Sequence, residues 1–238
     1  MGRPEQSESV AMAPHVASHP SLVSVQVGTP QDYLWLGRSL RSSIVKDPVP
    51  GSVAVTSTHL EGDEQSDPAQ HGGPDKAVYA YAAEDLDWWA HRLGRAMPPG
   101  MCGENLTTRG LDLREATIGE QWRVGTAVLQ VTEPRTPCWK LGMRMGDKLF
   151  PRAFAQARRP GVLLRVLQTG HLQAGQSIEV VGVPAHGVRA ADVTALYLGD
   201  HLDAAHVLSA PELAAHWQGW APHRTIWHLD EERKRGET

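Results

Sequence analysis

Short runs of apolar residues, each bounded by Gly or Pro, recur along the first three quarters of the chain. The runs are rich in Val, Leu and Tyr, a composition typical of β-strands. Gly125 interrupts one of them and predicts a tight bend or bulge between two strand pieces. Many short strands without a regular alternation of strand and helix favour a barrel or a sandwich. The predicted strands are 22–27, 52–60, 76–82, 121–133, 161–170 and 177–183.

Helical patterns are fewer. Residues 83–94 repeat apolar side chains at the i, i+3, i+4, i+7 spacing of an amphipathic helix, and Gly94 marks its end. Further short helices are predicted to begin near Cys138 and near Pro151. Residues 189–220 predict two or three short helices that follow the last strand.

The chain divides into four predicted parts. Residues 1–21 are polar and contain prolines, which predicts a flexible leader. Residues 22–183 hold all the predicted strands and form one β-rich domain. Residues 184–220 predict a small three-helix module, in which Ser209 is the N-cap of the last helix. Residues 221–238 form a charged tail.

Composition excludes several classes of protein. The net charge of −4 and the pI near 6.3 argue against broad nucleic-acid binding, which usually leaves a basic footprint. Two cysteines form neither a disulfide scaffold nor an all-cysteine cage for an iron–sulfur cluster. The chain has no secretory signal and no apolar run of the roughly 18 residues that span a bilayer, so we expect a cytoplasmic protein without membrane contact. It also lacks the common dinucleotide, P-loop and hydrolase motifs.

The segment 61–78 is the first of three polar clusters predicted to lie in loops. Gly72, Gly73 and Pro74 predict a tight turn, with His71 before it and Lys76 after it. Backbone N–H groups and a lysine in such a turn suit an anion. The simpler alternative is a polar connection whose glycines and proline only serve the turn.

The second cluster, residues 100–113, lies between the predicted helix and the next strand. Asn105 and Thr108 offer hydrogen-bond donors and acceptors suited to a heterocycle edge or a phosphate. Cys102 is expected to be a small packed residue. We expect the Glu104 carboxylate to hold the loop rather than to act as a general acid.

The third cluster, EPRTPCWKLGMR, surrounds Cys138. Cations and a helix N-terminus both favour a thiolate, which is a nucleophile or a soft metal ligand. The alternative is a buried cysteine that packs beside Trp139, and these residues alone leave the two interpretations balanced. The cations near Cys138 in the sequence are Arg135, Lys140 and Arg144.

Three blocks agree in order, spacing and identity with one known family. They are LEGDEQSDPAQHGGPDKAVYAY at 60–81, GENLTTRGL at 103–111 and TEPRTPCWKL at 132–141. Together they resemble the MOSC domain family (molybdenum cofactor sulfurase C-terminal), in its YiiM-like branch. The resemblance covers roughly residues 22–183 and implies a mainly β (α+β) fold, a MOSC-type β-barrel with a few short helices. The later helices resemble the small helical module that follows the barrel in that branch.

The resemblance also implies a function. Family members characterised as enzymes bind a molybdenum cofactor (molybdopterin) through a cysteine thiolate, a role that falls on Cys138. The branch includes reductases of N-hydroxylated compounds such as N-hydroxylated purines and amidoximes. The chain is too short for the pyridoxal-phosphate sulfurase module that some members carry, so pyridoxal phosphate is not expected. Electrons would come from a separate reductase or ferredoxin-like partner, and a homodimer is compatible with the resemblance.

Combining the clusters with the resemblance assigns a role to each candidate residue. His71 is the candidate proton donor for the reaction, because the unperturbed pKa of histidine lies near neutrality. Two alternatives remain: a sulfur carrier that uses a Cys138 persulfide in metal-cofactor maturation, and a non-catalytic carrier of the cofactor. The assignments are Cys138 on molybdenum, Lys76, Arg135 and Arg144 on the phosphate, and His71, Asn105 and Thr108 in the pterin or substrate pocket.

Overall fold

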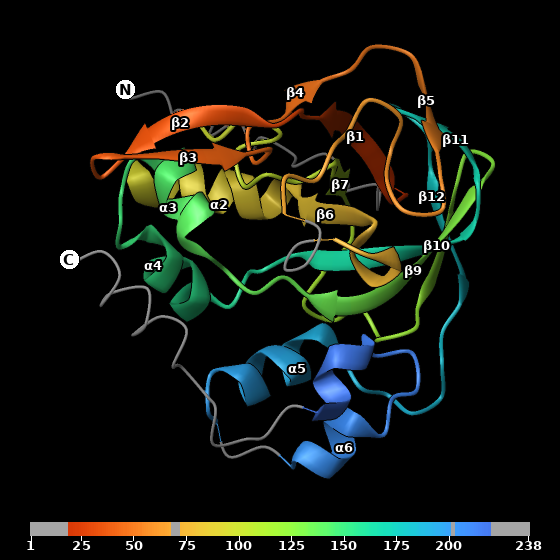
Figure 1. The fold of residues 1–238 in the computed structure, drawn as a ribbon. Coiled ribbons are helices and arrows are strands. Elements are labelled where there is room, and N and C mark those ends of the chain that lie inside the picture. The colour runs from red at the N-terminus through yellow and green to blue at the C-terminus, as the bar shows by residue number, and fades with distance from the viewer. Residues whose placement is uncertain (1–18, 68–71, 201–202, 220–238) are drawn as a thin grey trace, which may run out of the picture.

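The computed structural model describes residues 19–67, 72–200 and 203–219. Strands and short helices alternate irregularly along this part of the chain (Figure 1). The strands are β1 (Ser21–Val27), β2 (Gln31–Trp35), β3 (Arg38–Ser42), β4 (Asp47–Pro48), β5 (Ser52–Val55), β6 (Val78–Ala82), β7 (Leu106–Arg109), β8 (Gln121–Val124), β9 (Ala127–Pro134), β10 (Val162–Gln168), β11 (Gly170–Gln173) and β12 (Ile178–Gly182). The helices are α2 (Ala83–Leu93), α3 (Trp139–Met145), α4 (Phe150–Ala157), α5 (Ala190–Tyr197) and α6 (Ala204–Leu208), with 3-10 helices at Pro74–Lys76 and Ala215–Gly219.

The main sheet has eight strands in the order β12-β8-β9-β10-β6-β7-β1-β4. Neighbouring strands in this sheet are antiparallel, except for β6 and β7, which run parallel. The first half of β1, which β4 does not cover, meets the β12 end of the sheet: Leu22 N donates to Gln176 O at 2.9 Å, and Ile178 N donates to Pro20 O at 2.8 Å. The sheet therefore closes on itself into a barrel, and the predicted mainly β (α+β) fold is confirmed.

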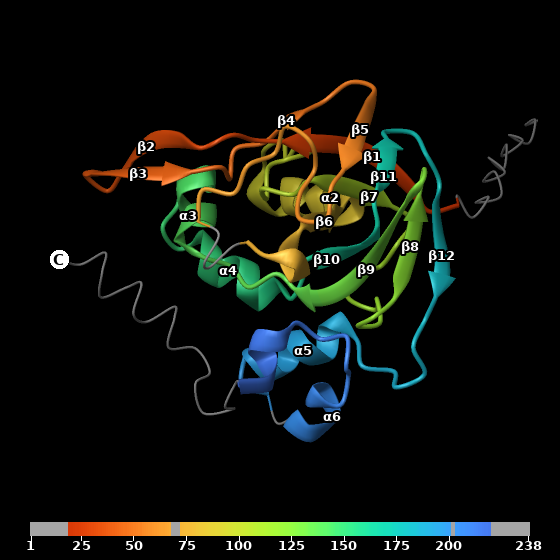
Figure 2. The same ribbon diagram turned by 45° about the vertical axis from the view of Figure 1, so that its right-hand side comes forward.

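Strand β6 is buried on both of its faces. Val78 and Ala80 point into the barrel core, whereas Tyr79 and Tyr81 belong to a second apolar cluster formed with α2, α3 and α4. Successive side chains of a strand point to opposite faces, so β6 separates the two cores. Figures 1 and 2 both place the three helices together on one side of the sheet. The candidate residues of the third cluster lie in this outer layer.

The helices predicted at 83–94, near Cys138 and near Pro151 are confirmed as α2, α3 and α4. Gly94 ends α2 with a positive φ of 62°, and its N–H donates to the Ala90 carbonyl. This is the left-handed cap that glycine forms without steric cost.

Two predictions from local pattern are wrong. Ser209 is not an N-cap: it ends α6, and its hydroxyl donates to the His206 carbonyl at 2.6 Å. The second cluster is not all loop either, because residues 106–109 form β7 beside β6.

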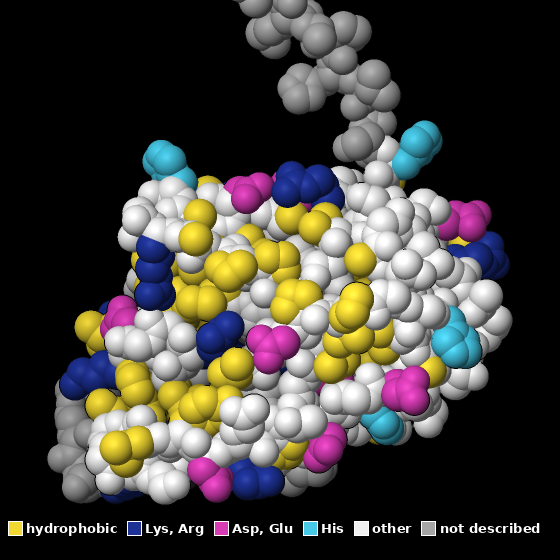
Figure 3. Space-filling model, turned by 90° about the horizontal axis from the view of Figure 1, so that it is seen from above, with side chains coloured by type: hydrophobic (Ala, Val, Ile, Leu, Met, Phe, Trp, Pro, Cys, Tyr) yellow, Lys and Arg dark blue, Asp and Glu magenta, His cyan; other side chains and the backbone are white. Residues whose placement is uncertain are grey.

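Residues 31–42, to which the pattern assigned no strand, form the hairpin of β2 and β3. Leu34 and Leu36 on this hairpin are 80% and 56% exposed. Figure 3 views the molecule from the side on which β2, β3 and β4 lie in Figure 1, and shows hydrophobic side chains interspersed with single charges.

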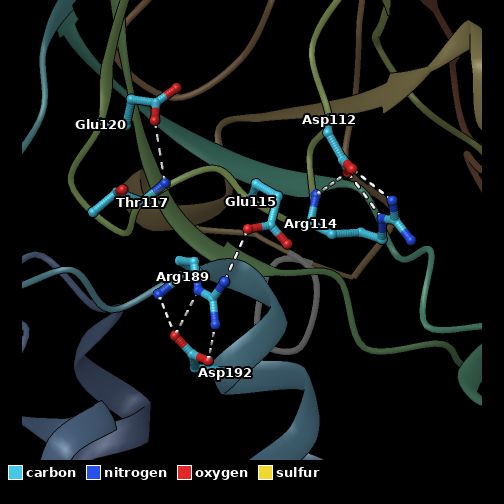
Figure 4. A network of polar contacts seen from close by, with 7 residues as sticks. All are labelled: Asp112, Arg114, Glu115, Thr117, Glu120, Arg189 and Asp192. Atoms are coloured by element: carbon cyan, nitrogen blue, oxygen red, sulfur yellow. Dashed lines mark hydrogen bonds and ion pairs between the residues drawn. The ribbon is translucent and has the colours of Figure 1, made fainter.

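The C-terminal helices share the core of the barrel. Val193, Leu196 and Trp217 belong to the same apolar cluster as the inward-facing residues of the strands. A polar contact joins the same parts, since Arg189 donates to Glu115 at 2.9 Å; Arg189 also donates to Asp192 within α5 at 3.2 Å (Figure 4).

The predicted domain boundaries stay a prediction. The charged tail 221–238 and almost all of the predicted leader lie outside the described residues. None of the helices within the described ranges has the length and apolarity that crossing a bilayer requires.

Candidate functional site

Cys138 lies at the N-terminus of α3 with its side chain half-buried. Its backbone is extended, with φ −135° and ψ 172°, and its carbonyl accepts a hydrogen bond from Leu141 N at 3.0 Å. Cys102 is fully buried in the outer cluster, and burial raises the pKa of its thiol. Of the two thiols, Cys138 is therefore the one placed to react or to bind a metal, and the expectation that Cys102 is a packed residue is confirmed.

Arg135 lies three residues before Cys138, and its guanidinium is near enough to interact electrostatically with the Cys138 thiol. Its guanidinium donates to the Cys102 carbonyl oxygen, and its Cζ lies 5.0 Å from the centroid of the Tyr79 ring. Burial disfavours the charged guanidinium, but the facing Tyr79 and Cys138 groups outweigh that effect and raise the pKa of Arg135. The site thus holds a permanent positive charge next to Cys138.

Glu104 holds the loop that supplies this carbonyl. Its buried carboxylate accepts hydrogen bonds from Gly100 N at 2.7 Å, Cys102 N at 3.0 Å and the Thr107 hydroxyl at 3.2 Å. Burial raises the pKa of Glu104, and these hydrogen bonds partly offset the rise. The expectation that Glu104 holds a loop is confirmed.

Asn105 uses its amide inside the protein. Its Oδ1 accepts from Tyr79 N at 3.1 Å, and its Nδ2 donates to Gln26 O at 3.2 Å and to Asp63 Oδ2 at 2.9 Å. Asp63 also forms a buried ion pair with Lys46. Asn105 therefore joins three segments of the chain, and its contact with a cofactor stays a prediction.

Thr108 is not brought together with Cys138. Leu106 points into the barrel core, and Thr108, two residues along the same strand, shares that inward face. Arg135 instead lies against Tyr79, on the outward face of β6. The role predicted for Thr108 in the pocket stays a prediction, and His71 lies outside the described residues.

The other predicted cations differ in their surroundings. Lys76 lies at the seam with the C-terminal helices, where its Nζ is 3.9 Å from Glu133 Oε1. Lys140 pairs with Asp67 at 3.3 Å. Arg144 follows Cys138 on α3, and its Nε is buried with no hydrogen-bond partner in the part of the chain that the structure describes.

A shallow hollow lies beside the loop before Cys138. It is lined by residues that include Arg135 and Pro137, Phe154 of α4 and Tyr197 of α5. The sequence clusters did not include any residue of α4 or α5 at this place. Tyr79 was missed as well, although the period-two alternation of β6 would have placed it on the outward face.

The site offers one soft metal ligand, the Cys138 thiol, and a fixed positive charge near it, the Arg135 guanidinium. Within residues 19–67, 72–200 and 203–219 there is no group of three His, Cys, Asp or Glu side chains that could hold a metal ion. Cys138 is suited to bind a metal that arrives with other ligands, or to act as a nucleophile toward an anionic partner.

Comparisons with known proteins find several relatives of this chain. The MOSC domain model matches residues 67–179, which include Glu104, Arg135 and Cys138. The Bacillus subtilis (strain 168) protein YflK is 36% identical over 168 residues, which cover 71% of this chain and 76% of YflK. A Gibberella moniliformis protein named reductase is 34% identical over 161 residues, 63% of this chain and 27% of that protein. The crystal structure of YiiM from Geobacillus stearothermophilus matches with a TM-score of 0.69 and 31% identity, over 84% of this chain and 96% of YiiM.

Proposed function

Because the chain belongs to the MOSC domain family, we propose that it binds the molybdenum cofactor and reduces N-hydroxylated compounds such as N-hydroxylated purines and amidoximes. The observation that carries the proposal is the half-buried Cys138 thiol with the fixed guanidinium of Arg135 beside it. The fungal relative named reductase supports an oxidoreductase activity, although this chain covers only 27% of it.

The residues present fit such a cofactor. Molybdenum favours a soft thiolate, and the pterin cofactor brings a phosphate and further ligands for the metal. The buried Nε of Arg144 has no hydrogen-bond partner among the described residues, so this donor is available to an anionic group of a bound cofactor. Arg135 keeps its charge where an anion would lie next to Cys138.

The cofactor, when bound, supplies two-electron chemistry at molybdenum, and the chain supplies binding and electrostatics. Cys138 would hold the metal, while Arg135 and Arg144 would neutralise the anionic groups. An N–OH substrate takes up two electrons and two protons, its N–O bond breaks, and water leaves. The electrons would come from a separate reductase or ferredoxin-like protein. The protons would come from solvent or from His71. A cytoplasmic location and a homodimer remain part of the proposal.

Metal and pterin analysis tests the proposal. The wild-type protein, expressed in a host that makes the cofactor, should contain molybdenum and pterin. Cys138→Ala should lose the metal, because the thiolate ligand is gone. Cys102→Ala is the matched control and should keep the metal, because Cys102 lies in the apolar cluster. Mass spectrometry of metals and fluorescence of the oxidised pterin provide the two readouts.

The same samples separate the alternatives. Wild-type protein with neither molybdenum nor pterin would contradict the proposal, and so would full metal content in Cys138→Ala. Cyanide-releasable sulfur on Cys138 without bound metal would indicate a sulfur carrier. A bound cofactor with no turnover of N-hydroxylated substrates, given a competent electron donor, would indicate a non-catalytic carrier.

A further inference from the structure

The direction of the Arg135 side chain is set by a backbone carbonyl. Its guanidinium has two described contacts, the Cys102 carbonyl oxygen and the face of the Tyr79 ring. The tyrosine is fixed in β6, between the two apolar cores. The carbonyl belongs to the loop between α2 and β7, so the position of the guanidinium depends on that loop.

This loop is held from two sides. On one side the Glu104 carboxylate accepts hydrogen bonds from Gly100 N and Cys102 N. On the other side Gly100 and Gly103 press against a neighbouring segment: a Cβ at Gly100 would lie 2.6 Å from Lys46 O, and a Cβ at Gly103 2.7 Å from Ile44 Cγ1. Both glycines have positive φ angles, 85° and 79°. The loop therefore has little freedom while the carboxylate is in place.

We propose that Glu104 is a positioning residue of the Cys138 site: its carboxylate fixes the loop whose Cys102 carbonyl holds the Arg135 guanidinium beside the Cys138 thiol. Glu104 is fully buried and its oxygens bond the loop, so it acts through Arg135 without touching a ligand. The inference rests on the proposed function in one respect: that function explains why the site needs the Arg135 charge close to Cys138.

The alkylation of Cys138 measures the position of Arg135 without any cofactor. Iodoacetate is anionic and iodoacetamide is neutral, and both react with the same thiolate. The ratio of their rates at one pH therefore cancels the thiolate population and reports the local electrostatic potential. Arg135→Gln should lower this ratio about fivefold, the effect of a unit charge about 4 Å away in bulk water. Cys138→Ser should show no labelling, because Cys102 is fully buried.

Glu104→Gln separates positioning from charge by the sign of the change. If Glu104 acted only through its negative charge, the substitution would raise the ratio of iodoacetate to iodoacetamide rates. If Glu104 positions Arg135, the loop loses an acceptor for Cys102 N, the guanidinium leaves the thiol, and the ratio falls at least twofold. A rise, no change or a smaller fall would overturn the proposal.

A double variant tests the route of the effect. In the Arg135→Gln background, Glu104→Gln should cause no further fall in the ratio, because coupled residues are not additive. A further fall of similar size would mean that Glu104 acts on Cys138 by another route, and the proposal would be wrong.

Gly103→Ala perturbs the same loop without a change in charge and should also lower the ratio, because its Cβ collides with Ile44. If Glu104→Gln does not fold, Gly103→Ala serves as the test variant instead, and an unchanged ratio of the two alkylation rates would then overturn the proposal.

Glu120→Gln is the matched control. Glu120 also holds a turn, through Thr117 N at 3.2 Å and Trp122 Nε1 at 2.7 Å, and its substitution should leave the ratio unchanged.

The outcome is independent of the proposed function. Protein without molybdenum would contradict the reductase assignment but would leave the rate ratio measurable. If the cofactor binds, Glu104→Gln should also reduce its retention, in the same direction as Arg135→Gln.

Discussion

Asp63→Ala is expected to lower the free energy of unfolding by about 3–5 kcal/mol, because it leaves the buried ammonium of Lys46 without a counter-charge. The two side chains are 2% and 9% exposed, so water cannot replace the lost carboxylate. Burial already lowers the pKa of Lys46, an effect that Asp63 partly offsets. Gly28 N and the Asn105 amide, at 2.8 and 2.9 Å, lose their acceptor as well. Urea unfolding followed by tryptophan fluorescence measures the change.

Asp32→Ala is the matched control for this substitution. Asp32 pairs with Arg41 at 3.5 Å, and both side chains are more than half exposed. Surface pairs of this kind contribute less than about 1 kcal/mol, so the unfolding midpoint should hardly move. Equal losses for the two variants would show that the Lys46–Asp63 pair is solvated in solution.

Removing the second partner should restore part of the stability. In Lys46→Met/Asp63→Ala no charge remains buried, so the double variant should be more stable than Asp63→Ala alone. A double variant that is no more stable than Asp63→Ala would contradict this expectation and would locate the cost in the lost acceptor of Gly28 and Asn105 rather than in the unpaired charge.

Elements with a strong local pattern were predictable. Helix α2 has both an apolar stripe and a terminal glycine, and β6 is a compact apolar run, so each is specified by neighbouring residues. The polar strand β7, LTTR, lacks such a pattern: Thr107 is buried through hydrogen bonds to Glu104 and Gln26, which local sequence does not reveal. Ser209 is an example of a local pattern that misled: it resembles an N-cap in sequence, but it ends α6, and Ala210 and Leu213 after it are buried.

The candidate site was predictable to a similar degree. Cys138 and Arg135 lie three residues apart, so sequence alone predicted their association. The partners of Asn105 come from segments as distant as Gln26 and Asp63, and no local pattern announces them. A resemblance in sequence marks Asn105 as part of the motif without showing whether it contacts a ligand or holds the fold. The buried lysine at position 46 was equally hidden, because lysine is almost never fully buried without a partner.

Trp217→Ala is expected to destabilise the whole molecule by about 3–5 kcal/mol, in a single unfolding transition. The indole is 2% exposed, belongs to the apolar cluster that the C-terminal helices share with the barrel, and donates to Glu133 Oε2 at 2.6 Å. The cavity would therefore open between the two parts rather than inside either one. Hydrogen exchange should become faster in β9 as well as in α5, because β9 carries Glu133.

The single transition is the decisive part of this expectation. A helical module that folds independently would give two transitions, with the barrel midpoint unchanged and faster exchange confined to residues 184–219. Trp35→Ala provides the comparison, since Trp35 lies on the β2–β3 hairpin, outside both apolar clusters, and should cost much less. A single shifted transition for Trp217→Ala would mean that the barrel and the C-terminal helices unfold as one unit. The part of α5 that lines the hollow beside the Cys138 loop, with Tyr197, would then be as stable as the barrel.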